Sequence, residues 1–86
     1  MIADFHKDFR KELEKMPKKY QEHFYKKLDI FFENPFHPIL NNHQRSGKLE
    51  NTRSINITGD IRAIYKQTGD ERVLFLTIAS HSKLYD

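Results

Sequence analysis

Apolar side chains recur every three or four residues along the first part of the chain. The first stripe is formed by Phe5, Phe9, Leu13 and Met16, with charged side chains between them. This spacing predicts an amphipathic helix, and Asp4 is placed to cap its first turn.

A second apolar stripe predicts another helix from Lys18 to Glu33. Its apolar positions are Tyr20, Phe24, Leu28 and Phe31, broadened by Tyr25 and Phe32. Pro17 suits the first turn of this helix. Asn34 should end it, because the residue before a proline is pushed out of the helical region. The two helices are expected to form a hairpin whose apolar face needs a sheet to cover.

The apolar period changes from 3.6 to 2 in the second half of the chain. Residues 34–48 carry the prolines, asparagines and glycine typical of a loop. Residues 52–57 and 61–67 then alternate, and 73–78 is nearly all apolar, as a strand buried on both faces would be. Turns are expected at 58–60 and 68–70. We predict one α+β domain over residues 1–86, with an N-terminal helical hairpin packed on one face of a small, mainly antiparallel twisted sheet.

Composition narrows the class of protein. Seven phenylalanines and four tyrosines give enough apolar surface for a compact core. The chain has no cysteine, which excludes a disulfide scaffold, a thiol nucleophile and a thiolate zinc site. No apolar run approaches the ~20 residues of a membrane span, and the first ten residues lack the apolar core of a signal peptide. A cytoplasmic protein that does not contact membranes is therefore expected.

Charge gives a weak indication of a phosphate-bearing partner. The net charge is +3, which is compatible with a polyanion but does not require one. The distribution is more informative, because bases outnumber acids between residues 44 and 66. In that stretch Arg45, Lys48, Arg53, Arg62 and Lys66 are opposed only by Glu50 and Asp60.

Arg62 is the first candidate for chemistry. Strand alternation places it on the face opposite Ile61, Ala63 and Tyr65. A guanidinium held on a strand could bind a phosphate as charge builds in a transition state. The alternative is an ordinary surface ion pair with a nearby carboxylate.

Two histidines are further candidates. His81 follows the last apolar strand and is close to Lys83, a position that suits an exposed general acid or base. His43 lies in the loop before the strands, and for each histidine a plain surface role is the alternative. Tyr85 could stack on a nucleobase or pin the C-terminus to the sheet. No spacing typical of a zinc site is present, so neither a metal nor another cofactor is expected.

The order and spacing of these residues resemble the RelE/ParE toxin superfamily, with YafQ-like and RelE/StbE-type mRNA interferases the most similar. The resemblance covers essentially the whole chain. Its motifs are His43-x-x-x-Gly47, Arg53-Ser54-Ile55, Asp60-x-Arg62-x-x-Tyr65, Gly69-Asp70 and Ile78-x-x-His81-x-x-Leu84-Tyr85. The resemblance implies a microbial-RNase-like fold and metal-independent cleavage of mRNA, commonly on the ribosome.

The resemblance also implies roles for individual residues. The catalytic set would be His43, Asp60, Arg62 and His81. Tyr85 would match the terminal aromatic of the family. Together with the basic side chains expected to bind phosphate, it gives a predicted substrate-binding set of Arg45, Lys48, Arg53, Lys83 and Tyr85. Two positions depart from the YafQ pattern, because Asn56 stands where YafQ has a second histidine and Thr77 where it has an arginine. Arg62 would then replace the missing cation, and either His43 or Asp60 would be the general base.

Two other functions fit the same resemblance. One is a non-enzymatic ParE-like toxin that binds and poisons DNA gyrase, and the other is an inactive homologue that only binds an antitoxin. Every version implies a cognate antitoxin protein as partner. The nuclease version adds mRNA on the ribosome as a partner. It implies no direct contact with DNA except through the antitoxin complex.

Overall fold

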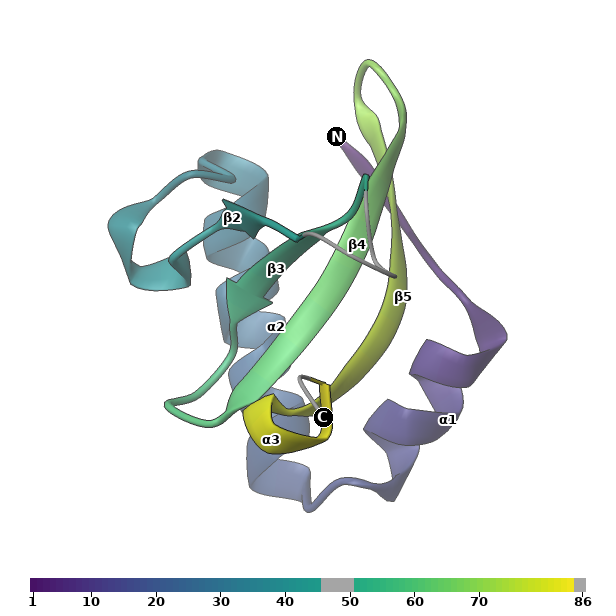
Figure 1. The fold of residues 1–86 in the computed structure, drawn as a ribbon, viewed down its shortest axis with the longest axis vertical. Coiled ribbons are helices and arrows are strands. Elements are labelled where there is room, and N and C mark those ends of the chain that lie inside the picture. Colours follow the sequence, from purple (N-terminus) through teal and green to yellow (C-terminus); the bar gives the residue numbers. More distant parts are fainter. Residues whose placement is uncertain (46–50, 85–86) are drawn as a thin grey trace.

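The computed structural model describes residues 1–45 and 51–84, and these form helices packed against a mixed five-stranded sheet (Figure 1). The strands are β1 (Ile2–Phe5), β2 (His43–Gln44), β3 (Arg53–Asn56), β4 (Ile61–Gly69) and β5 (Arg72–Ser80). The helices are α1 (Lys7–Lys15), α2 (Lys18–Glu33), the 3₁₀ turn η1 (Pro38–Leu40) and α3 (His81–Leu84). The predicted α+β class is confirmed.

The sheet is antiparallel except at one edge. Its order is β1-β5-β4-β3-β2, and β1 runs parallel to β5 while the other neighbours are antiparallel. β1 was not predicted from the sequence, because four residues next to a helical stripe give little periodicity. An exposed ion pair from Arg72 Nε to Asp4 Oδ2, 2.7 Å long, joins the two strands.

The predicted start of the first helix was wrong. Asp4 lies in β1, and the cap of α1 is His6, whose Nδ1 accepts a hydrogen bond of 3.1 Å from the Asp8 N–H. The guanidinium of Arg72 holds the pKa of Asp4 below its usual value. The Asp4 carboxylate therefore forms an ion pair at the edge of the sheet and does not cap the helix.

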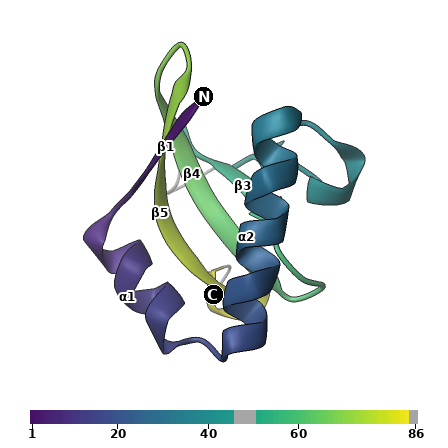
Figure 2. The same ribbon diagram turned by 180° about the vertical axis from the view of Figure 1, so that it is seen from behind.

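The second helix matches its prediction. It spans Lys18–Glu33, with Pro17 as the N-cap residue and Asn34 as the C-cap. Figure 2 shows α2 crossing one face of the sheet, with α1 beside β5. Together the two helices bury that face.

The core between the helices and the sheet is aromatic. Phe75 on β5 is fully buried. Its ring centroid lies 5.5–5.8 Å from those of Phe5, Phe9, Phe24, Phe31 and Tyr65. Aromatic pairs at such distances add to the burial of apolar area.

The strand predictions hold with shifted ends, but burial of residues 73–78 on both faces was wrong. Val73, Phe75 and Ile78 are buried, and the residues between them are only half-buried, because one face of β5 is not covered by the helices. The turn between β4 and β5 is at residues 70–71 and not 68–70, because Gly69 still pairs with Arg72. Alternation along β4 is as predicted, since Ala63 and Tyr65 enter the core while Arg62 faces the opposite side. That opposite face, which we call the open face, carries α3 at one end (Figure 1).

The expected loop at 34–48 contains two short elements within its described part. Asn41 ends η1 with a positive φ of 45°, a conformation that asparagine adopts more readily than most residues. This turn directs the chain into β2, where His43 pairs with Ser54 of β3. Among the described helices, none has the length and apolar character needed to cross a membrane.

Candidate active site

The turn between β3 and β4 meets the end of β5. The backbone N–H of His81 donates a 2.7 Å hydrogen bond to the carbonyl of Asp60. The hydroxyl of Thr58 accepts from the N–H groups of Asp60 and Ile61, at 3.3 and 3.0 Å. These bonds hold Asp60 and His81 beside each other at one end of the sheet.

Arg62 lies at the same end, opposite Ala79 on β5. Its Nη1 donates to the carbonyls of Thr58 and Gly59, each at 3.1 Å. No carboxylate of the described chain lies within 4 Å of its guanidinium, so the alternative of a surface ion pair is not seen there. The Nε and Nη2 edge has no acceptor among the same residues and has the geometry to bind an anion.

His43 lies on the edge strand β2, where its own turn holds it. Its Nδ1 is 2.9 Å from the carbonyl of Asn41. A carbonyl can only accept, so a hydrogen bond here requires the proton on Nδ1, and Nε2 is then the acceptor when the ring is neutral. A histidine in this tautomer can take a proton from a substrate hydroxyl.

A polar network anchors the segment that carries His43. Asn42 Nδ2 donates to the hydroxyl of Tyr65 at 2.7 Å and to the carbonyl of Pro35 at 2.9 Å, while Arg53 Nε donates to Asn42 Oδ1 at 2.7 Å. The guanidinium of Arg53 also lies over the ring of Phe36, 5.1 Å from its centroid. Burial raises the pKa of the Tyr65 hydroxyl, and the hydrogen bond from Asn42 partly opposes this.

Arg53 therefore faces away from Arg62. It pairs with Tyr65 across β3 and β4, and the Tyr65 ring packs 5.0 Å from that of Phe31 on α2. Its position is on the helix-covered face, where it holds a loop. Substrate binding by Arg53 stays a prediction, and the face on which it lies argues against that role.

Two of the other predicted substrate residues, Arg45 and Lys83, lie at or beside α3. Arg45 is buried, and its Nη2 donates to the carbonyl of Leu84 at 3.4 Å, which links the end of β2 to α3. Lys83 is exposed on α3. Lys48 and Tyr85 lie outside the described residues.

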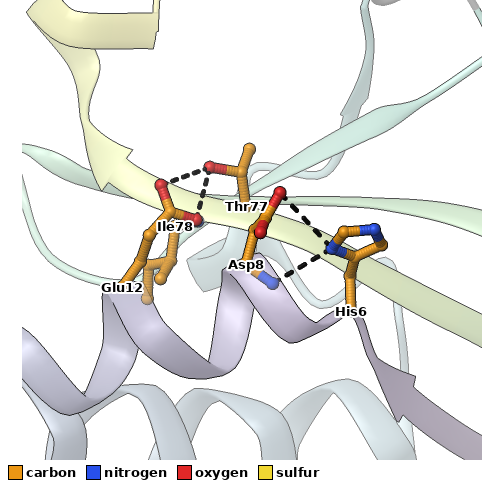
Figure 3. A network of polar contacts seen from close by, with 5 residues as sticks. All are labelled: His6, Asp8, Glu12, Thr77 and Ile78. Carbon is orange, nitrogen blue, oxygen red and sulfur yellow. Dashed lines mark hydrogen bonds and ion pairs between the residues drawn. The ribbon is translucent and has the colours of Figure 1, made fainter.

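The two departures from the YafQ pattern have different surroundings. Asn56 pairs with Arg62, and its buried Oδ1 has no hydrogen-bond partner within residues 1–45 and 51–84. Thr77 is used by α1 instead, because its hydroxyl lies 2.9 Å from both carboxylate oxygens of Glu12 (Figure 3). Position 77 therefore supplies no cation. Its partner Glu12 was not predicted from the sequence.

Of the four predicted catalytic residues, Asp60, Arg62 and His81 occupy adjacent backbone positions at one end of the sheet. His43 shares the open face but is farther from Arg62. The two residues are separated by two strands across the sheet, which is roughly 10 Å, and by two residues along the strand direction, which is roughly 7 Å. One phosphate and its ribose would have to bridge that gap. Among the described residues there is no cluster of three or more side chains able to hold a metal ion.

The sequence from residue 3 to residue 85 matches the family described as the ParE toxin of the type II toxin–antitoxin system, parDE. The chain belongs to this family. The predicted membership of the RelE/ParE superfamily is thereby confirmed, and the protein is a type II toxin. No curated protein matches the sequence significantly.

Solved structures share the fold at low sequence identity. YafQ from E. coli strain BL21(DE3) superimposes with a TM-score of 0.81 at 17% identity, covering 98% of this chain and 97% of that one. The YoeB/ParE toxin from Agrobacterium tumefaciens gives 0.79 at 16% identity, with coverage of 94% and 99%. YafQ in the E. coli DinJ–YafQ toxin–antitoxin complex gives 0.73 at 20% identity, with coverage of 98% and 96%.

Proposed function

We propose that this toxin is a metal-independent endoribonuclease that cleaves mRNA, in the cytoplasm and on the ribosome, and so inhibits translation. The observation that supports this most is the meeting of Asp60, Arg62 and His81 at one end of the sheet. An acid, a base and a cation for one phosphate are what phosphodiester cleavage without a metal requires. The structural similarity to YafQ and YoeB favours the same activity.

The reaction proposed is transesterification within the RNA. The base takes the proton of a 2′-hydroxyl, and that oxygen attacks the adjacent phosphorus. Arg62 stabilises the charge on the phosphoryl oxygens through its Nε and Nη2 edge. The bond from phosphorus to the 5′-oxygen breaks as His81 protonates the leaving oxygen, which yields a 2′,3′-cyclic phosphate. DNA lacks the nucleophile and would not be cleaved.

Two side chains can serve as the general base, and one structural observation supports each of them. Asp60 is fixed beside His81 at the end of the sheet that carries Arg62. His43 has the acceptor tautomer but is farther from Arg62. Comparing Asp60→Asn with His43→Asn decides between them, because only loss of the true base removes proton abstraction.

The proposal includes a cognate antitoxin as partner. Toxins of the same fold are found with DinJ in the E. coli DinJ–YafQ complex and with YefM in the YoeB–YefM complex from Staphylococcus aureus. The positive net charge of this chain would favour a partner with acidic segments.

Primer extension on mRNA from expressing cells tests the activity. Wild-type protein should produce discrete new 5′ ends within seconds to minutes of induction. His81→Ala and Arg62→Ala should each reduce cleavage by about 10²–10⁴-fold, the usual contribution of one general acid or one charge-stabilising group.

Matched controls keep the result interpretable. His23→Ala and Arg10→Ala remove the same side-chain types from exposed helix positions and should cleave like wild type. Circular dichroism must show the same fold in all four variants. Wild-type cleavage in His81→Ala would remove this histidine from the mechanism.

The family match also favours a second function, poisoning of DNA gyrase without catalysis. That function needs no general acid, so His81→Ala would remain toxic. Induction would then provoke DNA damage while mRNA stays intact. A DNA-damage reporter measured beside the primer extension separates the two functions.

A further inference from the structure

A cavity of about 200 Å³ lies at the end of the sheet opposite to α3. It is enclosed by the end of α2, the loop after this helix and the strands β3, β4 and β5, beside the N-terminus of the chain (Figure 1, Figure 2). Gln67 lines the cavity and is five residues from Arg62 on β4, which is roughly 17 Å along the strand. The cavity is therefore separate from the candidate active site.

Aromatic rings form much of the cavity. Phe31 and Tyr65 are buried at its floor, and their ring centroids lie 5.0 Å apart. Pro35 and Phe36 line the side toward the loop, and Phe36 is 61% exposed. The volume is below the ~300–1,000 Å³ typical of sites for drug-sized ligands. A space of this size and lining suits one planar apolar ring.

Arg53 brings a positive charge to the cavity. Its guanidinium lies over Phe36, 5.1 Å from the ring centroid, and its Nε donates to Asn42 Oδ1 at 2.7 Å. No carboxylate of the described chain lies within 4 Å of this guanidinium. A guanidinium has five N–H groups in a planar fork, so Arg53 retains donors for a planar anion.

The other charged groups that line the cavity leave this charge in place. Arg72 is bound to the carboxylate of Asp4 through hydrogen bonds of 2.7 and 3.1 Å. Asp70 is exposed in the turn between β4 and β5, where water and salt screen its carboxylate. The half-buried guanidinium of Arg53 therefore favours an anion inside the cavity.

The hydroxyl of Tyr65 adds a donor to the same place. A guanidinium only donates and a carbonyl only accepts, so Asn42 must direct Oδ1 at Arg53 and Nδ2 at the carbonyl of Pro35. Asn42 Nδ2 also donates to the Tyr65 oxygen at 2.7 Å, and within the described residues no acceptor takes the Tyr65 proton. Burial raises the pKa of Tyr65, so the hydroxyl keeps this proton at neutral pH.

We propose that this cavity binds a small aromatic carboxylate, which accepts hydrogen bonds from Arg53 and Tyr65 while its ring packs against Phe31 and Phe36. Guanidinium–carboxylate pairs are often bidentate, and such charge-assisted hydrogen bonds are stronger than neutral ones. A small molecule is favoured over a protein segment, because about 200 Å³ holds one ring with its acidic group and not a chain of several residues. The site lies outside the proposed nuclease mechanism and does not depend on it.

Binding in the cavity should also be sensed at His43. Arg53 holds Asn42, and Asn42 directly precedes His43 on the chain. A ligand carboxylate competes with Asn42 Oδ1 for the guanidinium. The amides of Asn42 and His43 are therefore expected to shift together with those that line the cavity.

Chemical-shift titration of the full-length ¹⁵N-labelled protein with phenylacetate tests the proposal. Phenylacetate should shift the amides of Arg53, Gln67 and Val73 saturably, with a Kd on the order of 1 mM, as expected for a ligand of about ten non-hydrogen atoms. Phenylacetamide keeps the shape without the charge, and acetate keeps the charge without the ring. Each should bind about tenfold more weakly, which is the loss expected from one charge-assisted hydrogen bond or from the buried ring.

Two substitutions remove the proposed donors. Arg53→Gln removes the charge and keeps an amide that can reach Asn42, while Tyr65→Phe keeps the ring and removes the hydroxyl. Each should weaken phenylacetate by about tenfold. Arg10→Gln is the matched control, because the guanidinium of Arg10 also lies over a phenylalanine ring, 5.5 Å from the centroid of Phe5, but does not line the cavity. Its affinity for phenylacetate should equal that of wild type.

Three outcomes would overturn the proposal. The first is equal affinity of the wild type for phenylacetate and phenylacetamide, a comparison that needs no variant to fold. The second is wild-type affinity in both Arg53→Gln and Tyr65→Phe. In the third, the shifts centre on Arg62 and are lost in Arg62→Gln, which would assign the anion to the candidate active site. Absence of RNA cleavage by the wild type would instead count against the proposed function alone, because ligand binding is measured without RNA.

Discussion

Arg62 and Tyr65 show how two residues of one strand face opposite sides of the sheet. The guanidinium of Arg62 stays on the open face, where its Nη1 holds the turn at Thr58 and Gly59. The hydroxyl of Tyr65 is buried against the loop that leads to His43, where Asn42 donates to it. Each side chain thus positions one part of the candidate site.

We predict that Tyr65→Phe destabilises the protein by about 1 kcal/mol, the usual net value of one hydrogen bond. Burial raises the pKa of Tyr65 above its ordinary value of 10.0, so the folded state holds this proton more tightly than the unfolded state. The resulting stabilisation is present below pH 10 and is lost as pH rises through the raised pKa. The free energy of unfolding, measured in urea, should therefore fall less between pH 8 and pH 11 in Tyr65→Phe than in wild type.

The control for this measurement is Tyr25→Phe, because Tyr25 is 52% exposed on α2. Its stability and its pH dependence should match those of wild type. Equal pH dependence in Tyr65→Phe and wild type would contradict the role given to Tyr65.

At the scale of elements, α1 completes the edge of the sheet that β1 leaves open. Glu12 reaches from the middle of α1 to the hydroxyl of Thr77 and the N–H of Ile78 (Figure 3). The helix therefore does more than cover the core. It also supplies the acceptor that the edge of β5 lacks.

Glu12→Ala should lower the free energy of unfolding by about 1–3 kcal/mol, because it leaves partly buried donors without an acceptor. Hydrogen exchange at the Ile78 amide should become faster. Urea unfolding and exchange measured by NMR check both effects. Glu14→Ala, at an exposed position of the same helix, should change stability by no more than about 0.5 kcal/mol.

In the molecule as a whole, the aromatic cluster around Phe75 packs the two long helices against the sheet. Phe75 brings side chains of β1, α1, α2 and β4 around one strand. A chain of this size buries only about 60–65% of its unfolded surface, so a single cluster carries much of the stability.

Phe75→Ala should therefore cost about 3–5 kcal/mol, which is a large part of the stability of a small domain. Thermal unfolding followed by circular dichroism should show a strongly lowered midpoint or no folded baseline. Phe32→Ala removes a ring that is 42% exposed and should unfold close to wild type. Similar midpoints for the two variants would refute the central role of Phe75.

Strong periodicity made the larger elements predictable. The stripe from Lys18 to Glu33 and the alternation in β4 required only side-chain polarity. The elements that were missed are short: β1, β2, η1 and α3 span two to four residues each. Their conformation depends on partners distant in sequence, as Ile2–Phe5 depends on β5.

The candidate site was predictable in its residue types but not in its geometry. The fold class, the family and the residue types of the candidate site could be read from the sequence, because these follow from local pattern and chemistry. Folding was needed to show that the backbone of Asp60 contacts that of His81, that Arg53 faces the helices and that Glu12 hydrogen-bonds to β5. Such contacts join residues far apart along the chain, and strand order and register set them only once the sheet has formed.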